Sequence, residues 1–152
     1  MSSIVQGSSG LIQLTYAEIK RKITYQKLFG LEELQNKLFG FCKGILTADD
    51  SMLNHFSLYD LAPSVLLYGP PNTGKTSLCY LLFDRIKKEV TNEVNFYTVD
   101  VGRMLDPALG QSSRNLGQIF QDLEKICSDG SSVFLLLDEL DGVIVTVIPV
   151  IS

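Results

Sequence analysis

The stretch that decides the fold is Gly69-Pro70-Pro71-Asn72-Thr73-Gly74-Lys75-Thr76, which directly follows the apolar run Val65-Leu66-Leu67-Tyr68. It fits the pattern G-x-x-x-x-G-K-[ST], which forms a phosphate-binding loop when a strand precedes it and a helix follows it. Glycines let the backbone N–H groups turn inward toward phosphates, and the helix adds its positive N-terminal end. A plain Gly/Pro turn would explain the two glycines but not Lys75-Thr76 at that offset. We therefore predict a buried strand, a phosphate loop and a helix ending near residue 90.

The residues that end this loop carry the expected chemistry. Lys75 is predicted to place its charge on the β- and γ-phosphates of a nucleotide, and the Thr76 hydroxyl to ligate Mg²⁺. The family resemblance described below implies that this nucleotide is ATP, so the expected cofactors are ATP and Mg²⁺. Contacts with the nucleotide are expected from the loop and the residue after it, namely Gly69, Pro70, Pro71, Asn72, Thr73, Gly74, Lys75, Thr76 and Ser77.

Beyond the loop, helical and strand patterns alternate. The helix over residues 74–90 has apolar side chains at two neighbouring stripes, and a strand is predicted over residues 95–101. A second helix begins after Ser113 and is followed by an unbroken apolar strand at 133–137. Its predicted apolar stripe is Leu116, Ile119, Phe120, Leu123, Ile126 and Cys127. This alternation predicts an α/β fold, in which a parallel sheet lies between layers of helices.

The last of these strands ends in Asp138-Glu139. Open parallel sheets bind ligands at the carboxyl ends of their strands. Asp138 is expected to hold Mg²⁺, directly or through water, and Glu139 to polarise a water molecule toward the γ-phosphate. An acidic pair after a strand is by itself typical of a surface turn. Downstream of a complete phosphate loop, at an interval that fits helix, strand and helix, it favours a hydrolytic site.

Four segments resemble one family. Tyr68 to Thr76 and Val133 to Glu139 resemble the Walker A and Walker B segments of AAA/AAA+ ATPases. Phe29-Gly30-Leu31-Glu32 resembles the family's hydrophobic-Gly segment, which implies that its first two residues, Phe29 and Gly30, lie against adenine. The stretch from Gly110 to Phe120 is similar to the family pattern G-E-S-x-x-N-I-x-x-[IVL]-F.

The resemblance covers residues 28–141 and implies a three-layer P-loop NTPase sheet of the AAA+ type. It implies an ATPase that powers remodelling of a protein or nucleoprotein partner and joins a homo- or hetero-oligomeric ring of AAA+ subunits. A neighbouring subunit's arginine would complete each site. Which protein is remodelled does not follow from the sequence.

Three positions depart from the family pattern. Asn72 replaces a loop glycine, but asparagine tolerates left-handed backbone, so nucleotide binding is expected to survive. Pro107-Ala108-Leu109 lacks the aromatic residue with which many members grip threaded polypeptide, which does not favour threading. Gln111 stands in place of a glutamate.

The largest departure is the apolar tail over residues 142–152. In the family, a strand with a polar sensor residue lies between the P-loop strand and the Walker B strand, and it would follow Asp141. Asp141-Gly142 is a turn signal, so the tail could fold back as a hairpin beside the strand at 133–137. It could also be a foreign tail, exposed and prone to aggregate. We favour the second interpretation, because a Val/Ile run fits no family element there. In both cases we expect the sheet to lack a central strand and to be incomplete at its C-terminal end.

The N-terminal part is predicted to be peripheral. Residues 1–15 are expected to form a flexible leader, and the segment that follows carries Lys20, Arg21, Lys22 and Lys27 on a solvated face. Next comes a helix with Leu34, Leu38, Phe41 and Ile45 on its apolar side, and a linker over residues 48–63. The predicted division is a leader and basic segment at 1–27, a partial AAA+ core at 28–141 and a non-family tail at 142–152.

Composition sets the broad class. The 152 residues are 45% hydrophobic and 20% charged, as in a globular domain. The net charge of −4 argues against a general affinity for nucleic acid, which needs clustered cations. Three cysteines without regular spacing predict neither a disulfide framework nor a metal site. We find no signal peptide and no membrane-spanning run, and expect an intracellular protein, cytoplasmic or nuclear.

Three functions remain open. The first is an ATPase that uses Lys75, Thr76, Asp138 and Glu139. The second is a truncated nucleotide-binding fragment that regulates a ring and has little or no ATPase activity of its own. The third, a P-loop kinase, fits least well because a kinase must exclude water, whereas Glu139 is placed to polarise it.

Overall fold

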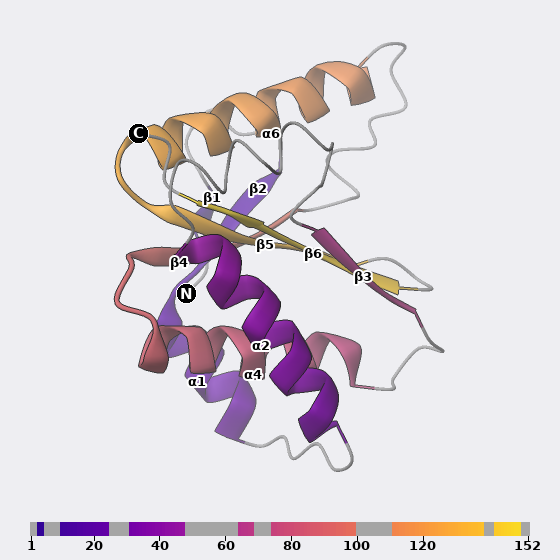
Figure 1. Cartoon of the computed structure of the whole chain (residues 1–152). Coiled ribbons are helices and arrows are strands. Elements are labelled where there is room, and N and C mark those ends of the chain that lie inside the picture. Colours follow the sequence, from indigo (N-terminus) through magenta and orange to yellow (C-terminus); the bar gives the residue numbers. More distant parts are fainter. Residues whose placement is uncertain are drawn as a thin grey trace.

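The computed structural model describes residues 3–4, 10–24, 31–47, 64–68, 74–99, 111–138 and 142–149 of the chain. Within these ranges the chain forms six strands and four helices (Figure 1). In chain order they are β1 (Ser3–Ile4), β2 (Leu11–Leu14), α1 (Tyr16–Thr24), α2 (Glu32–Leu46), β3 (Ser64–Tyr68), α4 (Lys75–Glu89), β4 (Val94–Val99), α6 (Gln111–Ser128), β5 (Ser132–Asp138) and β6 (Gly142–Ile148). None of the helices in this part of the chain is long and apolar enough to cross a membrane.

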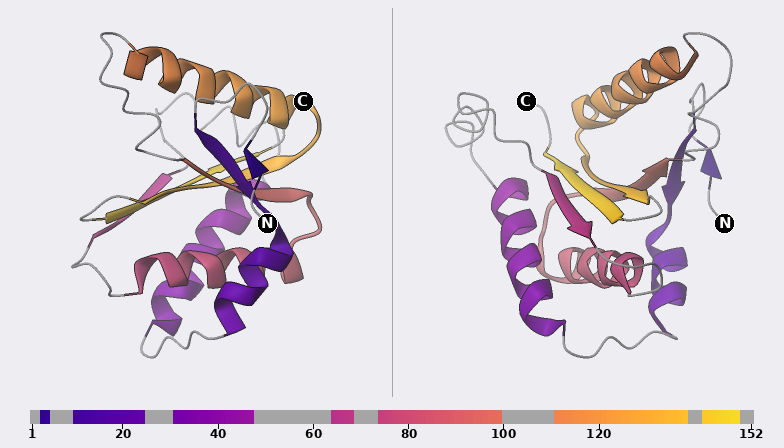
Figure 2. Two further views of the ribbon diagram at one scale, coloured as in Figure 1. Left: turned by 180° about the vertical axis from the view of Figure 1, so that it is seen from behind. Right: turned by 90° about the vertical axis from the view of Figure 1, so that its right-hand side faces the viewer.

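The strands form one sheet in the order β1-β2-β4-β5-β6-β3. β4 and β5 are parallel, whereas β6 runs antiparallel to both β5 and β3. β3, β4 and β5 therefore point the same way, as the alternation predicted, but the sheet is mixed rather than parallel throughout. Helices α1, α2 and α4 cover one face and α6 covers the other, which gives three layers (Figure 2).

Each face of the sheet has its own core. Under α4, the rings of Phe83, Phe96 and Phe134 lie with centroids 5.3–5.6 Å apart. Such aromatic contacts stabilise beyond the area they bury. On the other face, the stripe of α6 formed by Ile119, Leu123 and Cys127 is buried against the sheet.

The helical stripes are confirmed for α4 and wrong in part for two other helices. Phe120 of α6 is 61% exposed, and Leu34 and Phe41 of α2 are 38% and 36% exposed. Instead, α2 buries the neighbouring face, made of Leu38, Phe39, Cys42, Ile45 and Leu46. The cause lies in the packing against α4, where the Arg85 guanidinium stacks over the Phe39 ring at 4.1 Å and donates to Asn36 Oδ1 at 2.6 Å.

The expectation of a flexible leader over residues 1–15 is wrong for its apolar part. Strand β2 pairs antiparallel with β4, and Leu11 is completely buried. Helix α1 then packs on α4, with the Tyr16 hydroxyl donating to Asp84 Oδ1 at 2.6 Å and Ile19 fully buried. Its basic side chains are exposed, as predicted. The core thus includes residues that we had assigned to a separate N-terminal segment.

The prediction that the strand before the phosphate loop is buried is wrong in part. β3 is the last strand of the sheet, and Leu66 and Tyr68 are 43% and 79% exposed, while Leu67 is buried. The reason is that α6 packs over β4 and β5 and leaves this corner of the same face uncovered.

The apolar tail forms a central strand. β6 lies between β5 and β3, and its residues Val143, Val145 and Val147 are at most 2% exposed. Alternate side chains of a strand point to opposite faces, and these three valines join the core under α2 and α4. The hairpin interpretation is therefore confirmed, and the exposed foreign tail that we favoured is wrong for residues 142–149. The expected gap between β3 and β5 is filled by this strand.

Candidate functional site

Five of the predicted site residues lie in the described part of the chain: Gly74, Lys75, Thr76, Ser77 and Asp138. The others lie outside it, namely Phe29, Gly30, Gly69, Pro70, Pro71, Asn72, Thr73 and Glu139. The described residues come from two elements, the start of α4 and the end of β5.

Gly74 caps the N-terminus of α4 with a left-handed backbone, at φ 88° and ψ 13°. Its carbonyl accepts the first helical hydrogen bond, from the Leu78 N–H at 2.8 Å. Only glycine adopts this conformation without a steric cost, which explains the second glycine of the motif. Lys75, Thr76 and Ser77 follow in the first helical turn, where the positive end of the helix dipole favours an anion.

The contact that joins the two elements is a hydrogen bond from Thr76 Oγ1 to Asp138 Oδ2, 3.1 Å long. The two residues are far apart in the sequence, and the predicted magnesium ligands are thereby brought together. A hydroxyl and a carboxylate are oxygen donors of the kind that Mg²⁺ prefers, and this ion commonly takes few protein ligands and keeps several waters. The donor set therefore fits the predicted ion. No cluster of three or more His, Cys, Asp or Glu side chains that could hold a metal occurs among the described residues.

The strand register explains why these two groups meet. Val143 of β6 pairs with Asp138 on one side and with Leu67 on the other, so these residues lie at one level across three strands. The carboxyl ends of β3 and β5 therefore share one edge of the sheet. Helix α4 begins near that edge and runs back across the face, which places its first turn beside Asp138.

The side chains behind the site are kept neutral. Burial raises the pKa of the Cys79 thiol to about 12, with smaller contributions in the same direction from the nearby Cys42 and Asp138. Burial also raises the pKa of Tyr80, again with a contribution from Asp138. Cys79 and Tyr80, in the second turn of α4, are therefore neutral near physiological pH.

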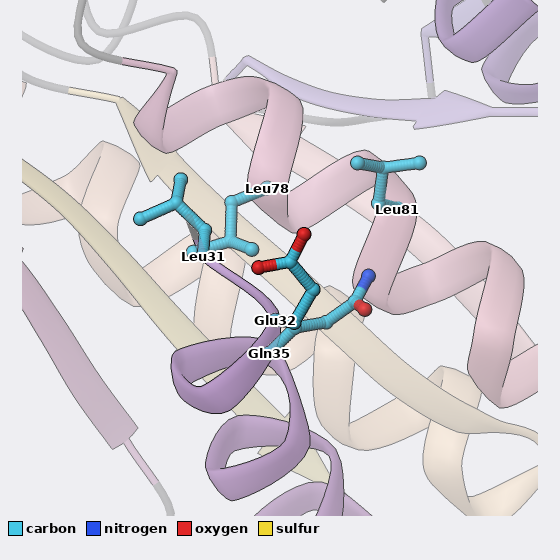
Figure 3. A pocket seen from close by; sticks show the side chains of 5 residues that line it. All are labelled: Leu31, Glu32, Gln35, Leu78 and Leu81. Carbon is cyan, nitrogen blue, oxygen red and sulfur yellow. The ribbon is translucent and has the colours of Figure 1, made fainter. Parts of the chain in front are cut away.

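A small groove lies between the start of α2 and the first turns of α4 (Figure 3). Its lining residues are Leu31, Glu32, Gln35, Leu78 and Leu81. The lining combines three leucines with the polar side chains of Glu32 and Gln35. Gln35 and Leu81 were not predicted from the sequence as site residues. The signal that could have pointed to them is the position of Leu31 and Glu32 directly after Phe29-Gly30.

Comparison with known proteins agrees with this geometry. The model of the AAA family, described as "ATPase family associated with various cellular activities", matches residues 65–147, which is more than half of the chain. The chain belongs to the AAA ATPase family. The matched range begins within β3, includes α4, β4, α6 and the whole of β5 with Asp138, and ends within β6.

Several AAA ATPases are similar in sequence. A "Proteasome-associated ATPase" of Nakamurella multipartita is 33% identical over 56% of this chain and 16% of its own length. An "AAA ATPase forming ring-shaped complexes" of Corynebacterium kroppenstedtii is 32% identical over 56% of this chain and 16% of its own length. "Cell division protein C" of Sulfolobus acidocaldarius is 27% identical over 84% of this chain and 31% of its own length. The chain thus spans less than a third of these relatives. No solved structure matches it.

Proposed function

We propose that this chain binds MgATP at the edge of the sheet where β3 and β5 end, as the nucleotide core of an AAA ATPase that hydrolyses ATP. The observation that carries the proposal is the hydrogen bond between Thr76 and Asp138. It joins the hydroxyl that follows the phosphate loop to the carboxylate that ends β5, which is parallel to β3 and separated from it by β6. This is the pair of groups that a Mg²⁺–phosphate complex requires.

Each residue then has a defined role. Lys75 neutralises the β- and γ-phosphates, Thr76 and Asp138 hold Mg²⁺, and Glu139 orients the attacking water. The bound ion would offset the charge that develops on the phosphate oxygens. The adenine ring would lie against Phe29 and Gly30, as the family resemblance implies.

We further propose that the chain works in a ring of AAA subunits and uses ATP to remodel a protein partner. Support comes from relatives whose names refer to ring-shaped complexes and to the proteasome. A neighbouring subunit would supply the arginine that completes the site, because an arginine finger can raise phosphoryl-transfer rates by about 10³–10⁵-fold. Turnover by the isolated chain is therefore expected to be slow.

The test is nucleotide binding by calorimetry, with and without Mg²⁺, followed by a turnover assay. The wild type is expected to bind MgATP, and Lys75→Ala to lose this binding. Glu139→Gln is expected to bind ATP but not to hydrolyse it. Equal turnover by Glu139→Gln and the wild type would exclude the role of Glu139, and unchanged affinity of Lys75→Ala would exclude the site itself.

A second candidate is a fragment that binds nucleotide and regulates a ring without turnover of its own. The observation that favours it is the direction of β6. This strand starts at the phosphate edge, with Gly142 opposite Tyr68 and Val143 opposite Asp138, so it presents no polar side chain there. The family's sensor strand would end in a polar residue at that place. Binding of MgATP without hydrolysis, even under single-turnover conditions, would support this candidate over the first.

A further inference from the structure

We propose that Gly142 is a positioning residue for the magnesium site, an inference that rests on the proposed function. Because Gly142 has no side chain, β6 approaches β3 closely at the phosphate edge. This close approach sets the spacing between β3 and β5, and with it the distance between Thr76 and Asp138.

The position of β6 links the two halves of the proposed site. It is the strand between β3, from which the phosphate loop departs, and β5, which ends in Asp138. Gly142 pairs with Tyr68, the last residue of β3, and the next residue pairs with both Leu67 and Asp138. Any change in the spacing between β3 and β6 near Gly142 therefore moves the phosphate loop relative to the Asp138 carboxylate.

Space, not backbone conformation, requires glycine here. The positive-φ glycines in the described part of the chain are Gly10, Gly74 and Gly130, so Gly142 has a backbone that other residues can adopt. A Cβ at Gly142, however, would lie 2.9 Å from the carbonyl oxygen of Leu67 and 3.4 Å from Leu66 Cδ1. The first of these atoms belongs to the backbone and cannot rotate away. Glycine at this position therefore allows β6 to pack closely against β3, in addition to the turn that the Asp141-Gly142 pair predicted.

An added methyl group must separate β3 from β6. β6 is held to β5 along six paired positions, from Val133 to Asp138, whereas β3 is the outermost strand of the sheet and is paired along five. β3 is therefore the strand that yields. Its end carries the phosphate loop and α4, so Thr76 moves away from Asp138. At 3.1 Å their hydrogen bond has little room to lengthen before it is lost.

The expected consequence is specific for the metal. The phosphate loop would move together with β3, so its contacts with the phosphates would be kept. The Mg²⁺ coordination that Thr76 of α4 shares with Asp138 of β5 would be disturbed. Gly142→Ala should therefore retain binding of ATP in EDTA but lose the gain in affinity that Mg²⁺ provides. We expect that gain to fall by about 10-fold or more, which is the scale at which residues that orient metal ligands act.

The experiment compares Gly142→Ala with Ile144→Ala, two residues further along the same strand and on the same face. Ile144 is half-buried, so its truncation weakens the strand without forcing it away from β3. Binding of a fluorescent ATP analogue is titrated in Mg²⁺ and in EDTA. The readout is the dissociation constant in EDTA divided by the dissociation constant in Mg²⁺. The ratio should fall in Gly142→Ala and stay at the wild-type value in Ile144→Ala. A purely structural role would change both variants alike.

Two further variants keep the inference open to refutation. If Gly142→Ala does not fold, Leu66→Ala/Gly142→Ala removes the side-chain contact and leaves the backbone contact, so the same loss of ratio is expected. Gly142→Ala/Asp138→Glu carries a longer carboxylate, which should recover part of the ratio. An unchanged ratio in the alanine variants would overturn the role of Gly142. A wild type that binds ATP equally with and without Mg²⁺ would overturn the proposed magnesium site, and this inference with it.

Discussion

Replacing Val145 with alanine tests whether β6 is a buried central strand. Val145 is 2% exposed and belongs to the core under α2 and α4. The substitution removes the equivalent of two buried methylene groups, at about 0.8 kcal/mol each. A cavity left in a packed core adds to this loss, so we expect the free energy of unfolding to fall by about 2–3 kcal/mol.

The assay is urea unfolding of both proteins, with the slope m compared to exclude a change in the unfolded state. In a chain of this size each kcal/mol lowers Tm by about 2–4 °C, so thermal unfolding gives a second estimate. The control is Thr146→Ala, since Thr146 lies on the other face and its hydroxyl meets that of Ser64 at an exposed position. That variant should lose less than about 1 kcal/mol. A Val145→Ala variant within about 0.5 kcal/mol of the wild type would refute the buried strand, because exposed positions behave in that way.

Two further predictions concern glycine and pH. Gly74→Ala should destabilise the chain by about 1–2 kcal/mol because of its left-handed backbone, whereas Gly44→Ala, with open space around it within α2, should stabilise by up to about 1 kcal/mol. Urea unfolding measures the change in the free energy of unfolding for both variants. A change of the same sign in both would contradict these expectations. Burial raises the pKa of the Cys42 and Cys79 thiols from 9.0 to about 12, so above pH 9 the unfolded thiols lose protons that the folded ones keep. Stability should therefore fall between pH 9 and 12. In Cys42→Ala, the free energy of unfolding should fall less steeply with pH than in the wild type. An identical pH profile in the two proteins would exclude thiol ionisation as the cause.

The sequence indicated that Thr76 and Asp138 lie close together, because the spacing of its motifs determines their place in an α/β sheet. Thr76 follows a loop that must leave one strand and begin a helix, and Asp138 ends a strand whose apolar residues require cover on both faces. The apolar stripe of α4 was predicted from the helical spacing of its apolar residues. These features depend on local patterns, which a sequence displays directly.

The features that the sequence did not predict depend on partners that are distant in the chain. A Val/Ile run has the same pattern whether the strand is exposed or central, so only its pairing with β3 and β5 identified β6 as buried. The phase of α2 depended on Arg85 of another helix, which covers Phe39 and leaves Phe41 outside. The exposure of Tyr68 depended on which strands α6 covers. In each case tertiary packing, rather than the local pattern, decided the outcome.

We propose that Thr76 and Asp138 together hold the magnesium ion of bound MgATP. A double-mutant cycle with Thr76→Val and Asp138→Asn tests it most directly, with MgATP affinity measured by calorimetry for the wild type, both single variants and the double variant. Since the two groups share one ion, the losses should not add, and we expect a coupling free energy of about 1 kcal/mol or more. In EDTA the coupling should vanish. Additive losses in Mg²⁺, or the same coupling without it, would contradict the claim.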